Sequence, residues 1–364
     1  MKLMYFINGS EASAAGIRAR SLARWLPPDW QIRFLYRSTP KWKSILPFLD
    51  AARQFRPDII YVMDTAYTGV LAAYAAKKLF GCKFLTDTGD AAYELARSAG
   101  TYSRTQLTLI RAIEELATRE SDYLIVRGSY HEDWLRKQGI EKVEFIPDGV
   151  DTGEVEPVDT TEFKRELGLE KARLVVGMVG TMEWSARHRM CYGWDIVEAL
   201  TFLRDLPIHA LLVGDGNGRA ILEERARELG VSDRIVFTGR VRYEELPRYL
   251  SLMDACVSTQ SNDRVGMVRT TGKLPLYLAF GKYVIATDVG EARRVLPGIG
   301  CLLPYEGVRD DTHPARLAAR LREALDRPER LAVAEAARRV ARENFDYPML
   351  ASRVEKVCRD LVRE

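Results

Sequence analysis

Short runs rich in β-branched and aromatic residues alternate with helical patterns along all 364 residues of the chain. This alternation is typical of βαβ units, in which parallel strands form a sheet and helices cover its faces. Six strands are predicted in the first half, at Leu3–Ile7, Ile32–Tyr36, Ile59–Met63, Lys83–Asp87, Tyr123–Arg127 and Val143–Pro147. Six more are predicted in the second half, at Leu174–Val179, Ile208–Val213, Ile235–Thr238, Ala255–Ser258, Tyr283–Ala286 and Cys301–Leu303. The sequence therefore predicts an α/β protein with two doubly wound, Rossmann-like domains.

The connector between the two halves runs from Asp151 to Thr161 and carries many acidic and few large apolar residues. We place the boundary after residue 152, so that residues 1–152 form the N-terminal domain and residues 153–345 the C-terminal domain. We leave open whether the last predicted helix, in residues 346–364, packs back on the N-terminal domain. Two such domains facing one another place the carboxyl ends of both sheets around one cleft, where open α/β sheets bind ligands.

The charge balance and the cysteines narrow the function classes. Fifty-four Lys and Arg residues face 51 Asp and Glu residues, a net charge of +3 that argues against a nucleic-acid binder driven by counterion release. The five cysteines show no CxxC or CxxH spacing, so neither a disulfide framework nor a zinc site is expected. The N-terminal apolar run is too short for a signal peptide, and no segment reaches the length that spans a bilayer. We expect a cytoplasmic protein, either free or attached to the inner face of the membrane.

The first 50 residues are the basic part of the chain, with eight Lys and Arg residues against three acidic ones. Within them, Lys41 and Lys43 interleave with five large apolar residues: Trp42, Ile45, Leu46, Phe48 and Leu49. This composition suits a segment that lies on an anionic membrane surface. It equally suits a helix packed on its own domain, with the lysine stems covering apolar surface.

A glycine-rich turn is the sharpest local signal for a ligand. Gly214, Asp215 and Gly216 follow a predicted buried strand and precede the predicted helix Ala220–Leu229. A turn of this kind lets the backbone approach a phosphate or a sugar closely, and the helix N-terminus adds a positive dipole end. The GxGxxG fingerprint is not matched, so a purely structural turn remains the alternative.

Three further motifs stand in order around this turn. They are the domain junction Phe145–Asp151, the Phe-x-Gly-x-Val pattern within Ile235–Val241, and the Ala-x-Gly-Lys-x-Val-Ile-Ala-Thr pattern at Ala279–Thr287. In this order and spacing the motifs resemble the GT-B glycosyltransferases of the large retaining family 4. The resemblance covers nearly the whole chain.

The resemblance implies a retaining transferase that moves a sugar from a nucleotide-sugar donor to a hydroxyl of a glycan or lipid-linked acceptor, in surface polysaccharide or glycoconjugate synthesis. The C-terminal domain would bind the donor and the N-terminal domain the acceptor, with the nucleotide sugar as substrate and no cofactor or metal required. Carried over onto matching positions, the donor-binding residues are Gly214, Asp215, Gly216, Arg240 and Val241. Gly16 joins them, because the Asn8–Gly16 loop matches the family's glycine-containing first loop.

The first departure from the family pattern concerns the diphosphate cations. The family carries an Arg and then a Lys-Gly pair after the first strand of the second domain, but here Tyr192 occupies the lysine position before Gly193. Arg187 and Arg189 are the nearest cations that can take over, since Arg suits bidentate phosphate contacts. A solvated basic loop is the alternative.

The second departure is the family's pair of glutamates. One alignment places Asp263 and Thr271 at their positions, and the other places Val268 and Leu276 there. The second glutamate is expected to contact the donor ribose, so another group has to take its place if a nucleotide binds. By sequence, the best-placed polar residues are Arg269, Lys273 and Glu291, with Arg264 a further cation on what we expect to be one cationic loop.

On the acceptor side, Asp87 and Asp90 follow a buried strand and fall at the carboxyl edge of the first predicted sheet. Either carboxylate can orient a sugar hydroxyl as a catalytic residue, or cap the following helix. The missing glutamates also motivate a second hypothesis, a catalytically degenerate GT-B-like protein that is the partner or regulatory subunit of an active glycosyltransferase. A third hypothesis is another GT-B chemistry, such as an epimerase or a phosphorylase.

Overall fold

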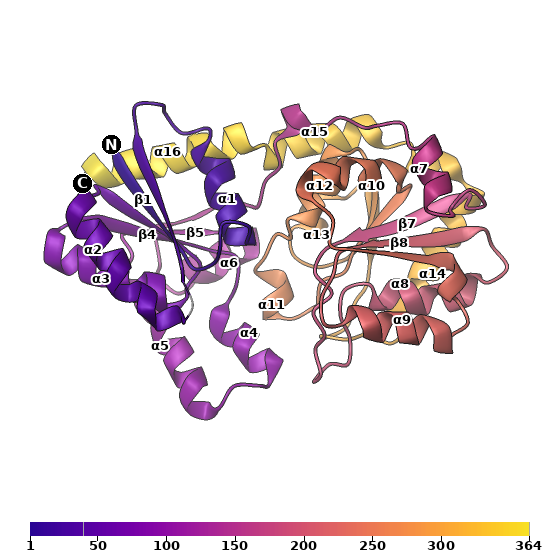
Figure 1. Ribbon diagram of the computed structural model, residues 1–364, viewed down its shortest axis with the longest axis horizontal. Coiled ribbons are helices and arrows are strands. Elements are labelled where there is room, and N and C mark those ends of the chain that lie inside the picture. Colours follow the sequence, from indigo (N-terminus) through magenta and orange to yellow (C-terminus); the bar gives the residue numbers. More distant parts are fainter. Residues whose placement is uncertain (39, 364) are drawn as a thin grey trace. The chain divides into compact units, whose positions relative to one another are not determined.

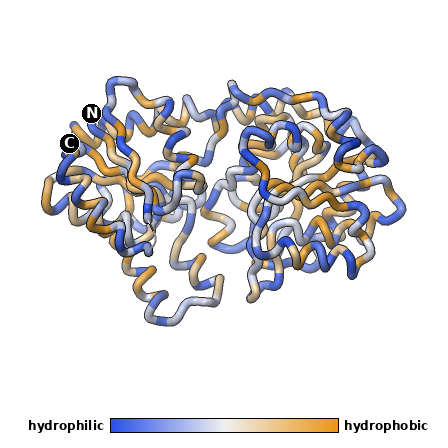
Figure 2. The backbone as a smooth tube through the Cα atoms, in the orientation of Figure 1, coloured by the Kyte–Doolittle hydropathy of each residue, from blue (hydrophilic) through white to orange (hydrophobic). Residues whose placement is uncertain are grey.

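The computed structural model describes residues 1–38 and 40–363 and contains, within them, two six-stranded parallel sheets (Figure 1). Each of the twelve predicted strands is present, and its ends lie within two residues of the prediction. The hydrophobic stretches of the chain, orange in Figure 2, are concentrated in these strands. The predicted α/β class with two doubly wound sheets is therefore confirmed.

The first sheet has the order β2-β1-β3-β4-β5-β6 and all its neighbours pair in parallel. Its strands are β1 (Lys2–Ile7), β2 (Gln31–Tyr36), β3 (Ile59–Met63), β4 (Lys83–Thr88), β5 (Tyr123–Val126) and β6 (Val143–Phe145). The helices that belong with it are α1 (Ala14–Ala23), α2 (Ile45–Phe55), α3 (Tyr67–Phe80), α4 (Ala92–Ala99), α5 (Arg104–Glu120), α6 (Ser129–Arg136) and α16 (Tyr347–Arg363). One hydrophobic core joins the sheet to α1 and α16, and another joins it to α2, α3 and α5. Both faces of the sheet are thus covered by helices, as its near-continuous apolar strands require.

The second sheet has the order β12-β11-β10-β7-β8-β9 and is also parallel throughout. Its strands are β7 (Leu174–Val179), β8 (Ile208–Val213), β9 (Ile235–Gly239), β10 (Ala255–Ser258), β11 (Tyr283–Thr287) and β12 (Gly300–Leu303). The helices along this part of the chain are α7 (Thr161–Glu166), α8 (Trp194–Ala199), α9 (Arg219–Glu228), α10 (Leu246–Leu252), α11 (Arg264–Met267), α12 (Lys273–Ala279), α13 (Ala292–Val295), α14 (His313–Asp326) and α15 (Ala334–Phe345). In this sheet the strand order reverses between β7 and β10, because the chain crosses back after β9.

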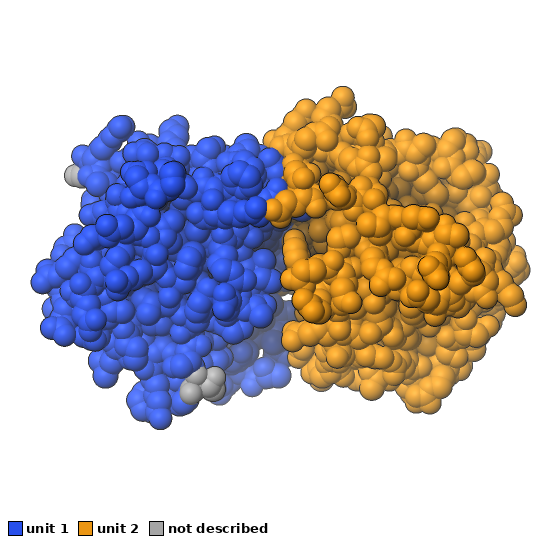
Figure 3. Space-filling view, turned by 45° about the horizontal axis from the view of Figure 1, so that its top comes forward, with its two compact units in different colours: residues 1–151, 267–270, 345–364 blue, residues 152–266, 271–344 orange. Residues whose placement is uncertain are grey.

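The chain divides into two compact units, coloured separately in Figure 3. Unit 1 comprises Met1–Asp151, Met267–Thr270 and Phe345–Glu364, and unit 2 comprises Thr152–Gly266 and Thr271–Asn344. The first division falls one residue before the expected boundary at residue 152. Helix α16 packs on α1 and contributes buried side chains to the core of the first sheet, so the end of the chain belongs to unit 1.

The basic segment near the N-terminus folds as a short 3-10 helix, Lys41–Ser44, followed by α2. Phe48 is buried against Phe6, and Ile45 and Leu49 pack on the same core. Only two of the five large apolar residues of the segment lie on the surface, Trp42 at 63% exposure and Leu46 at 74%. Among the described residues, no helix combines the length and the apolar character needed to cross a bilayer.

Candidate functional site

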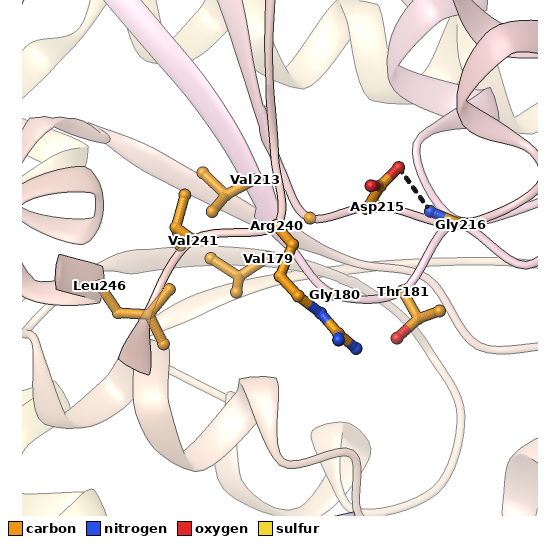
Figure 4. A pocket seen from close by; sticks show the side chains of 10 residues that line it. Val179, Gly180, Thr181, Val213, Asp215, Gly216, Arg240, Val241 and Leu246 are labelled. Atoms are coloured by element: carbon orange, nitrogen blue, oxygen red, sulfur yellow. Dashed lines mark hydrogen bonds between the residues drawn. The ribbon is translucent and has the colours of Figure 1, made fainter. Parts of the chain in front are cut away.

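The clearest candidate site lies in unit 2, at the carboxyl edge of the second sheet. Three consecutive loops, after β7, β8 and β9, enclose a cavity of about 580 Å³ (Figure 4). Its lining residues are Val179, Gly180, Thr181, Val213, Gly214, Asp215, Gly216, Arg240, Val241 and Leu246. Open parallel sheets bind ligands at this edge, next to the point where the strand order reverses. The structure therefore brings together five sequence-predicted donor residues, Gly214, Asp215, Gly216, Arg240 and Val241.

Close packing of backbone on backbone explains the glycines of this turn. Gly214 has a φ of 137°, and a Cβ atom there would lie 1.9 Å from the carbonyl oxygen of Gly180. A Cβ atom on Gly216 would lie 2.4 Å from the carbonyl oxygen of Met182. The Gly214 amide donates to the carbonyl of Gly239, and the Gly216 amide donates to Asp215 Oδ1 at 2.9 Å. These two amides are therefore already used within the protein.

The cavity has an apolar side and a polar side. Figure 4 shows Val179, Val213, Val241 and Leu246 gathered on one side and Arg240, Thr181 and Asp215 on the other. Ligand sites commonly combine an apolar wall with a few polar groups that fix orientation. The aliphatic side suits a flat ring such as a nucleobase, and the polar side suits phosphates and hydroxyls.

One cation, Arg240, lines this cavity, and a second, Lys273, lies beside one of its lining residues. Arg240 is exposed, and among the described residues no carboxylate lies within ion-pair distance of its guanidinium. Lys273 is the first residue of α12, and its Nζ lies 3.5 Å from the ring centroid of Tyr192. The same Nζ lies 3.6 Å from the position that a Cβ atom on Gly180 would occupy. Tyr192, which stands where the family has a lysine, thus holds a lysine from another element by a cation–π contact.

The remaining predicted donor residues of unit 2 lie elsewhere. Arg189 lines a second cavity together with Trp184 and Trp194, whereas Arg187 is exposed and lines neither cavity. Glu291 is 1% exposed and receives a 2.9 Å ion pair from Arg294. The structure therefore does not bring these three residues into the cavity of the glycine turn.

The cationic loop expected between residues 264 and 273 is divided by the fold. Arg264 lies in the short helix α11, and Arg269 lies in the Met267–Thr270 segment of unit 1, where it forms an ion pair with Asp90. Thr270 donates from its amide to the carbonyl of Arg127 at 2.9 Å, which fixes that segment. Of the expected loop cations, only Lys273 lies next to a residue of the unit 2 cavity.

Asp87 is the centre of a buried charge network in unit 1. It is fully buried and accepts hydrogen bonds from Arg18 Nε at 2.9 Å, Arg127 Nε at 2.9 Å and Tyr61 Oη at 2.8 Å. Arg18 also donates to the carbonyls of Pro147 and Ile146. Burial alone would raise the pKa of Asp87, but the two guanidinium groups and the hydrogen bonds from Tyr61 and Arg127 hold it below its usual value. Because both of its oxygens accept these hydrogen bonds, the Asp87 carboxylate fixes the positions of Arg18, Arg127 and Tyr61 at the edge of the sheet.

Asp90, in contrast, lies at a cavity of unit 1. This cavity of about 430 Å³ sits at the carboxyl ends of β1 to β4, beside the point where the strand order of the first sheet reverses. Asn8 joins the loops there, because its Nδ2 donates to the carbonyls of Met63 and Asp64 at 2.8 Å. Asp64 lines the same cavity in a left-handed conformation, with a φ of 67°, and pairs with Arg127 at 3.0 Å.

Sequence reasoning missed Arg18, Tyr61, Asp64 and Arg127. Their partner Asp87 lies up to 69 residues away along the chain, so no local spacing connects them. Gly16, the predicted residue of the first loop, lies inside α1, and a Cβ atom there would be 2.4 Å from the carbonyl oxygen of Glu11. It lets the loop pack against the helix, and its proposed contact with donor phosphates stays a prediction.

No group of three or more His, Cys, Asp or Glu side chains in residues 1–38 and 40–363 is placed to hold a metal ion. All five cysteines are free thiols. The cavity of the glycine turn carries one carboxylate, Asp215, and the unit 1 cavity carries two, Asp64 and Asp90.

A buried carboxyl in α8 is expected to give unit 2 a pH-dependent stability. Asp195 is 5% exposed in α8, and burial raises its pKa to about 7 despite a hydrogen bond with Thr259. The folded state therefore holds a proton between about pH 4 and pH 7 that the unfolded state has released. The free energy of unfolding of unit 2 therefore falls as the pH rises through that range.

Replacing Asp195 with asparagine should remove this pH dependence. As the pH rises from 5 to 8, we expect the free energy of unfolding of Asp195→Asn to increase by about 2–4 kcal/mol relative to that of the unmodified protein, since one pKa unit corresponds to about 1.4 kcal/mol. Urea unfolding at both pH values measures the difference. Asp233→Asn, at an exposed carboxyl of the same unit, is the control, and equal behaviour of the two variants would contradict the assignment.

Family models match both halves of the chain. The model described as "Glycosyl transferases group 1" matches residues 173–327, and the "Glycosyl transferase 4-like domain" matches residues 8–149. Outside these matches lie only the first seven residues, the connector 150–172 and the terminal segment 328–364.

Curated relatives are similar over part of their length. The 2-deoxystreptamine N-acetyl-D-glucosaminyltransferase of Streptomyces fradiae is 28% identical over 228 residues, which are 59% of this chain and 52% of that protein. The lipopolysaccharide core biosynthesis mannosyltransferase LpsB of Rhizobium meliloti is 30% identical over 161 residues, 41% of this chain and 42% of the relative. These alignments span about half the length of the curated relatives.

Solved structures match over the full chain. HepE from Anabaena, crystallised in complex with UDP-glucose, superposes with a TM-score of 0.79 at 17% identity and covers 99% of this chain and 100% of that chain. Sucrose-phosphate synthase from Thermosynechococcus elongatus gives a TM-score of 0.77 at 19% identity, with 100% and 99% covered. At these identities the likeness shows the fold alone, which is the GT-B fold of glycosyltransferases.

Proposed function

Because the chain belongs to the group 1 glycosyl transferases, we propose that it transfers a sugar, with retention, from a nucleotide-sugar donor to a hydroxyl of a glycan or lipid-linked acceptor. Surface polysaccharide or glycoconjugate synthesis is the process that we assign to it. The unit 2 cavity carries the proposal, since it combines an aliphatic wall, a glycine turn and the cation Arg240 at the carboxyl edge of a doubly wound sheet, with Lys273 beside its residue Gly180.

We assign the donor diphosphate to Arg240 and Lys273. Departure of a nucleoside diphosphate develops negative charge, and fixed cations in a partly enclosed site stabilise that charge in the transition state. Arg240 offers a guanidinium that is not committed to a carboxylate among the described residues. Lys273 is held beside Gly180 by the Tyr192 ring. Structural neighbours such as HepE were crystallised with UDP and UDP-glucose, which makes UDP the first nucleotide to test.

Asp215 is our candidate for the hydroxyl contact that the family makes with its second glutamate. It is the carboxylate among the described residues that line the cavity, and its Oδ1 accepts the Gly216 amide. Its other oxygen accepts no hydrogen bond from the described residues, so it can receive a ribose or sugar hydroxyl. Val268 and Leu276 offer no such group, and Asp263, whose Oδ1 is bonded to Ser261 Oγ and to the Gly266 amide, does not line the cavity.

A matched pair of arginine variants tests the donor site. Arg240→Ala should weaken UDP binding about 10- to 100-fold, because a hydrogen bond to a charged group contributes roughly 1.5–3 kcal/mol. Arg242→Ala should change it less than about twofold, since Arg242 lies two residues away, is 79% exposed and pairs with Glu244. Isothermal titration measures both, and equal effects would exclude the assignment. Arg187→Ala and Arg189→Ala, titrated in the same way, decide whether those residues contribute.

For the acceptor we propose the unit 1 cavity, with Asp90 orienting the attacking hydroxyl. Asp90 lies at the cavity with a 42% exposed side chain, whereas Asp87 is enclosed.

We also propose peripheral attachment to an anionic membrane through Trp42 and Leu46, flanked by Lys41 and Lys43. Vesicle co-sedimentation of Trp42→Ser against Trp25→Ser, a variant at another exposed tryptophan, tests this attachment.

The absence of both glutamates favours one further candidate, a degenerate GT-B protein acting with an active transferase. Turnover of a nucleotide sugar by the purified chain excludes that candidate. UDP binding without turnover, together with co-purification of a second glycosyltransferase, supports it.

A further inference from the structure

The unit 1 cavity has an apolar floor formed by two helices. Figure 1 shows α4 and α5 side by side in unit 1, joined by residues 100–103. Seven apolar residues from this pair face the cavity: Ala92, Leu95, Ala96, Ala99, Leu109, Ile110 and Ile113, with Tyr102 from the connection. Leu95 is 38% exposed, Tyr102 46% and Leu109 58%. Large apolar side chains gathered around one cavity, and left in contact with water, mark a ligand site more often than a surface without a role.

The mouth of the same cavity is polar and carries two cations. Arg37 and Lys41 line it together with Asp64, Thr88 and Asp90. Both acidic residues are already paired, Asp64 with Arg127 and Asp90 with Arg269. Neither Arg37 nor Lys41 has a carboxylate within ion-pair distance among the described residues. The uncompensated charge at the mouth is therefore positive.

Arg37 is also partly withdrawn from water. Burial lowers the pKa of its guanidinium, while the nearby Tyr67 and Asp64 act in the opposite direction. A partly desolvated cation without a paired anion is unfavourable, and a bound anion would relieve it. The mouth thus favours a phosphate-like group next to the place where Asp90 would orient a hydroxyl.

From these two halves of one cavity we infer that the acceptor is an amphiphile, with an apolar chain between α4 and α5 and a phosphate group at Arg37 and Lys41. This inference rests on the proposed function, since it names the class of acceptor for that same transferase. A cavity of about 430 Å³ is within the range that encloses a small ligand. A purely polar sugar acceptor would leave the α4–α5 floor exposed to water.

Binding of decyl phosphate to the full chain, below its critical micelle concentration, tests the inference. We expect decyl phosphate to bind at least tenfold more tightly than inorganic phosphate, which lacks the chain, and than decyl maltoside, which lacks the charge. Leu109→Asp should weaken decyl phosphate binding at least tenfold. Leu79→Asp should leave it unchanged, because Leu79 is 66% exposed on α3 and does not line the cavity. Arg37→Gln should remove the preference for decyl phosphate over decyl maltoside.

Three results would overturn the inference: equal affinities in the two leucine variants, decyl phosphate binding no tighter than inorganic phosphate, or binding to anionic vesicles without binding to monomeric decyl phosphate. The last result would identify a membrane-contacting surface in place of a cavity for one chain. UDP titration of the unmodified protein tests the proposed function separately, because the UDP site is assigned to unit 2. Failure of UDP binding would therefore be distinguishable from failure of the acceptor inference.

Discussion

Replacing Asp87 with alanine is expected to lower the free energy of unfolding of unit 1 by about 3–5 kcal/mol. The change removes the shared acceptor of two guanidinium groups, on Arg18 at 2% exposure and on Arg127 at 9%. Arg18 keeps its carbonyl partners and a 3.3 Å ion pair with Asp148, and Arg127 keeps Asp64, but both lose the fully buried carboxylate that they share. Removing one partner of a buried ion pair is costly because the remaining charge stays out of water. Urea unfolding followed by hydrogen exchange in β3, β4 and β5 reports on this unit alone.

Asp90→Ala is the matched control for Asp87→Ala. Asp90 lies three residues further along the same edge of the sheet, and its ion pair with Arg269 is partly exposed. Pairs of that kind contribute about 0–1 kcal/mol. If the two alanine variants unfolded at the same urea concentration, Asp87 would not be the anchor of the buried network.

The second large effect is expected at the glycine turn. Gly214→Ala should destabilise unit 2 by roughly 3–5 kcal/mol and abolish UDP binding at concentrations that saturate the unmodified protein. A φ of 137° is strained for alanine, and its Cβ would lie 1.9 Å from the Gly180 carbonyl oxygen. The loops after β7 and β8 would have to separate, and both of them line the cavity. Titration with UDP and urea unfolding measure the two consequences.

Gly230→Ala measures the cost of a positive φ for alanine without the steric clash that Gly214→Ala introduces. Gly230 also has a positive φ, 65°, but nothing lies within 4 Å of the position of its Cβ. We expect a loss of about 1 kcal/mol from the left-handed conformation and an unchanged UDP affinity. A Gly214→Ala protein that still bound UDP normally would show that the turn does not form the donor site.

The strands could be predicted because their signal is local. Runs such as Ile59–Met63 and Leu174–Val179 are apolar throughout, as parallel strands buried on both faces require. The cavity of unit 2 was largely predictable for the same reason, since Gly214, Asp215, Gly216, Arg240 and Val241 each follow directly on a strand. Parallel strands bring their carboxyl ends to one edge, so residues in these positions meet.

What the sequence did not predict depends on contacts between distant segments. The cation at the Tyr192 position comes from Lys273, 81 residues later, through contact with the ring. The expected loop from Arg264 to Lys273 is split, because its middle residues 267–270 belong to unit 1, where the Thr270 amide donates to the carbonyl of Arg127. Asp87 was expected, like Asp90, to orient a sugar hydroxyl or cap a helix at the sheet edge, but Arg18, Tyr61 and Arg127 enclose it. No alternation or spacing encodes such pairings.

Hydrogen exchange with and without UDP tests most directly whether a nucleoside diphosphate binds at the glycine turn of unit 2. We predict that UDP slows amide exchange in residues 180–182, 214–218 and 239–241, which form the loops around the cavity. Peptides around Trp184, Arg189 and Arg309, which line the second cavity of unit 2, should exchange at unchanged rates. Unchanged exchange in the three loops at saturating UDP, or protection confined to the second cavity, would contradict the account.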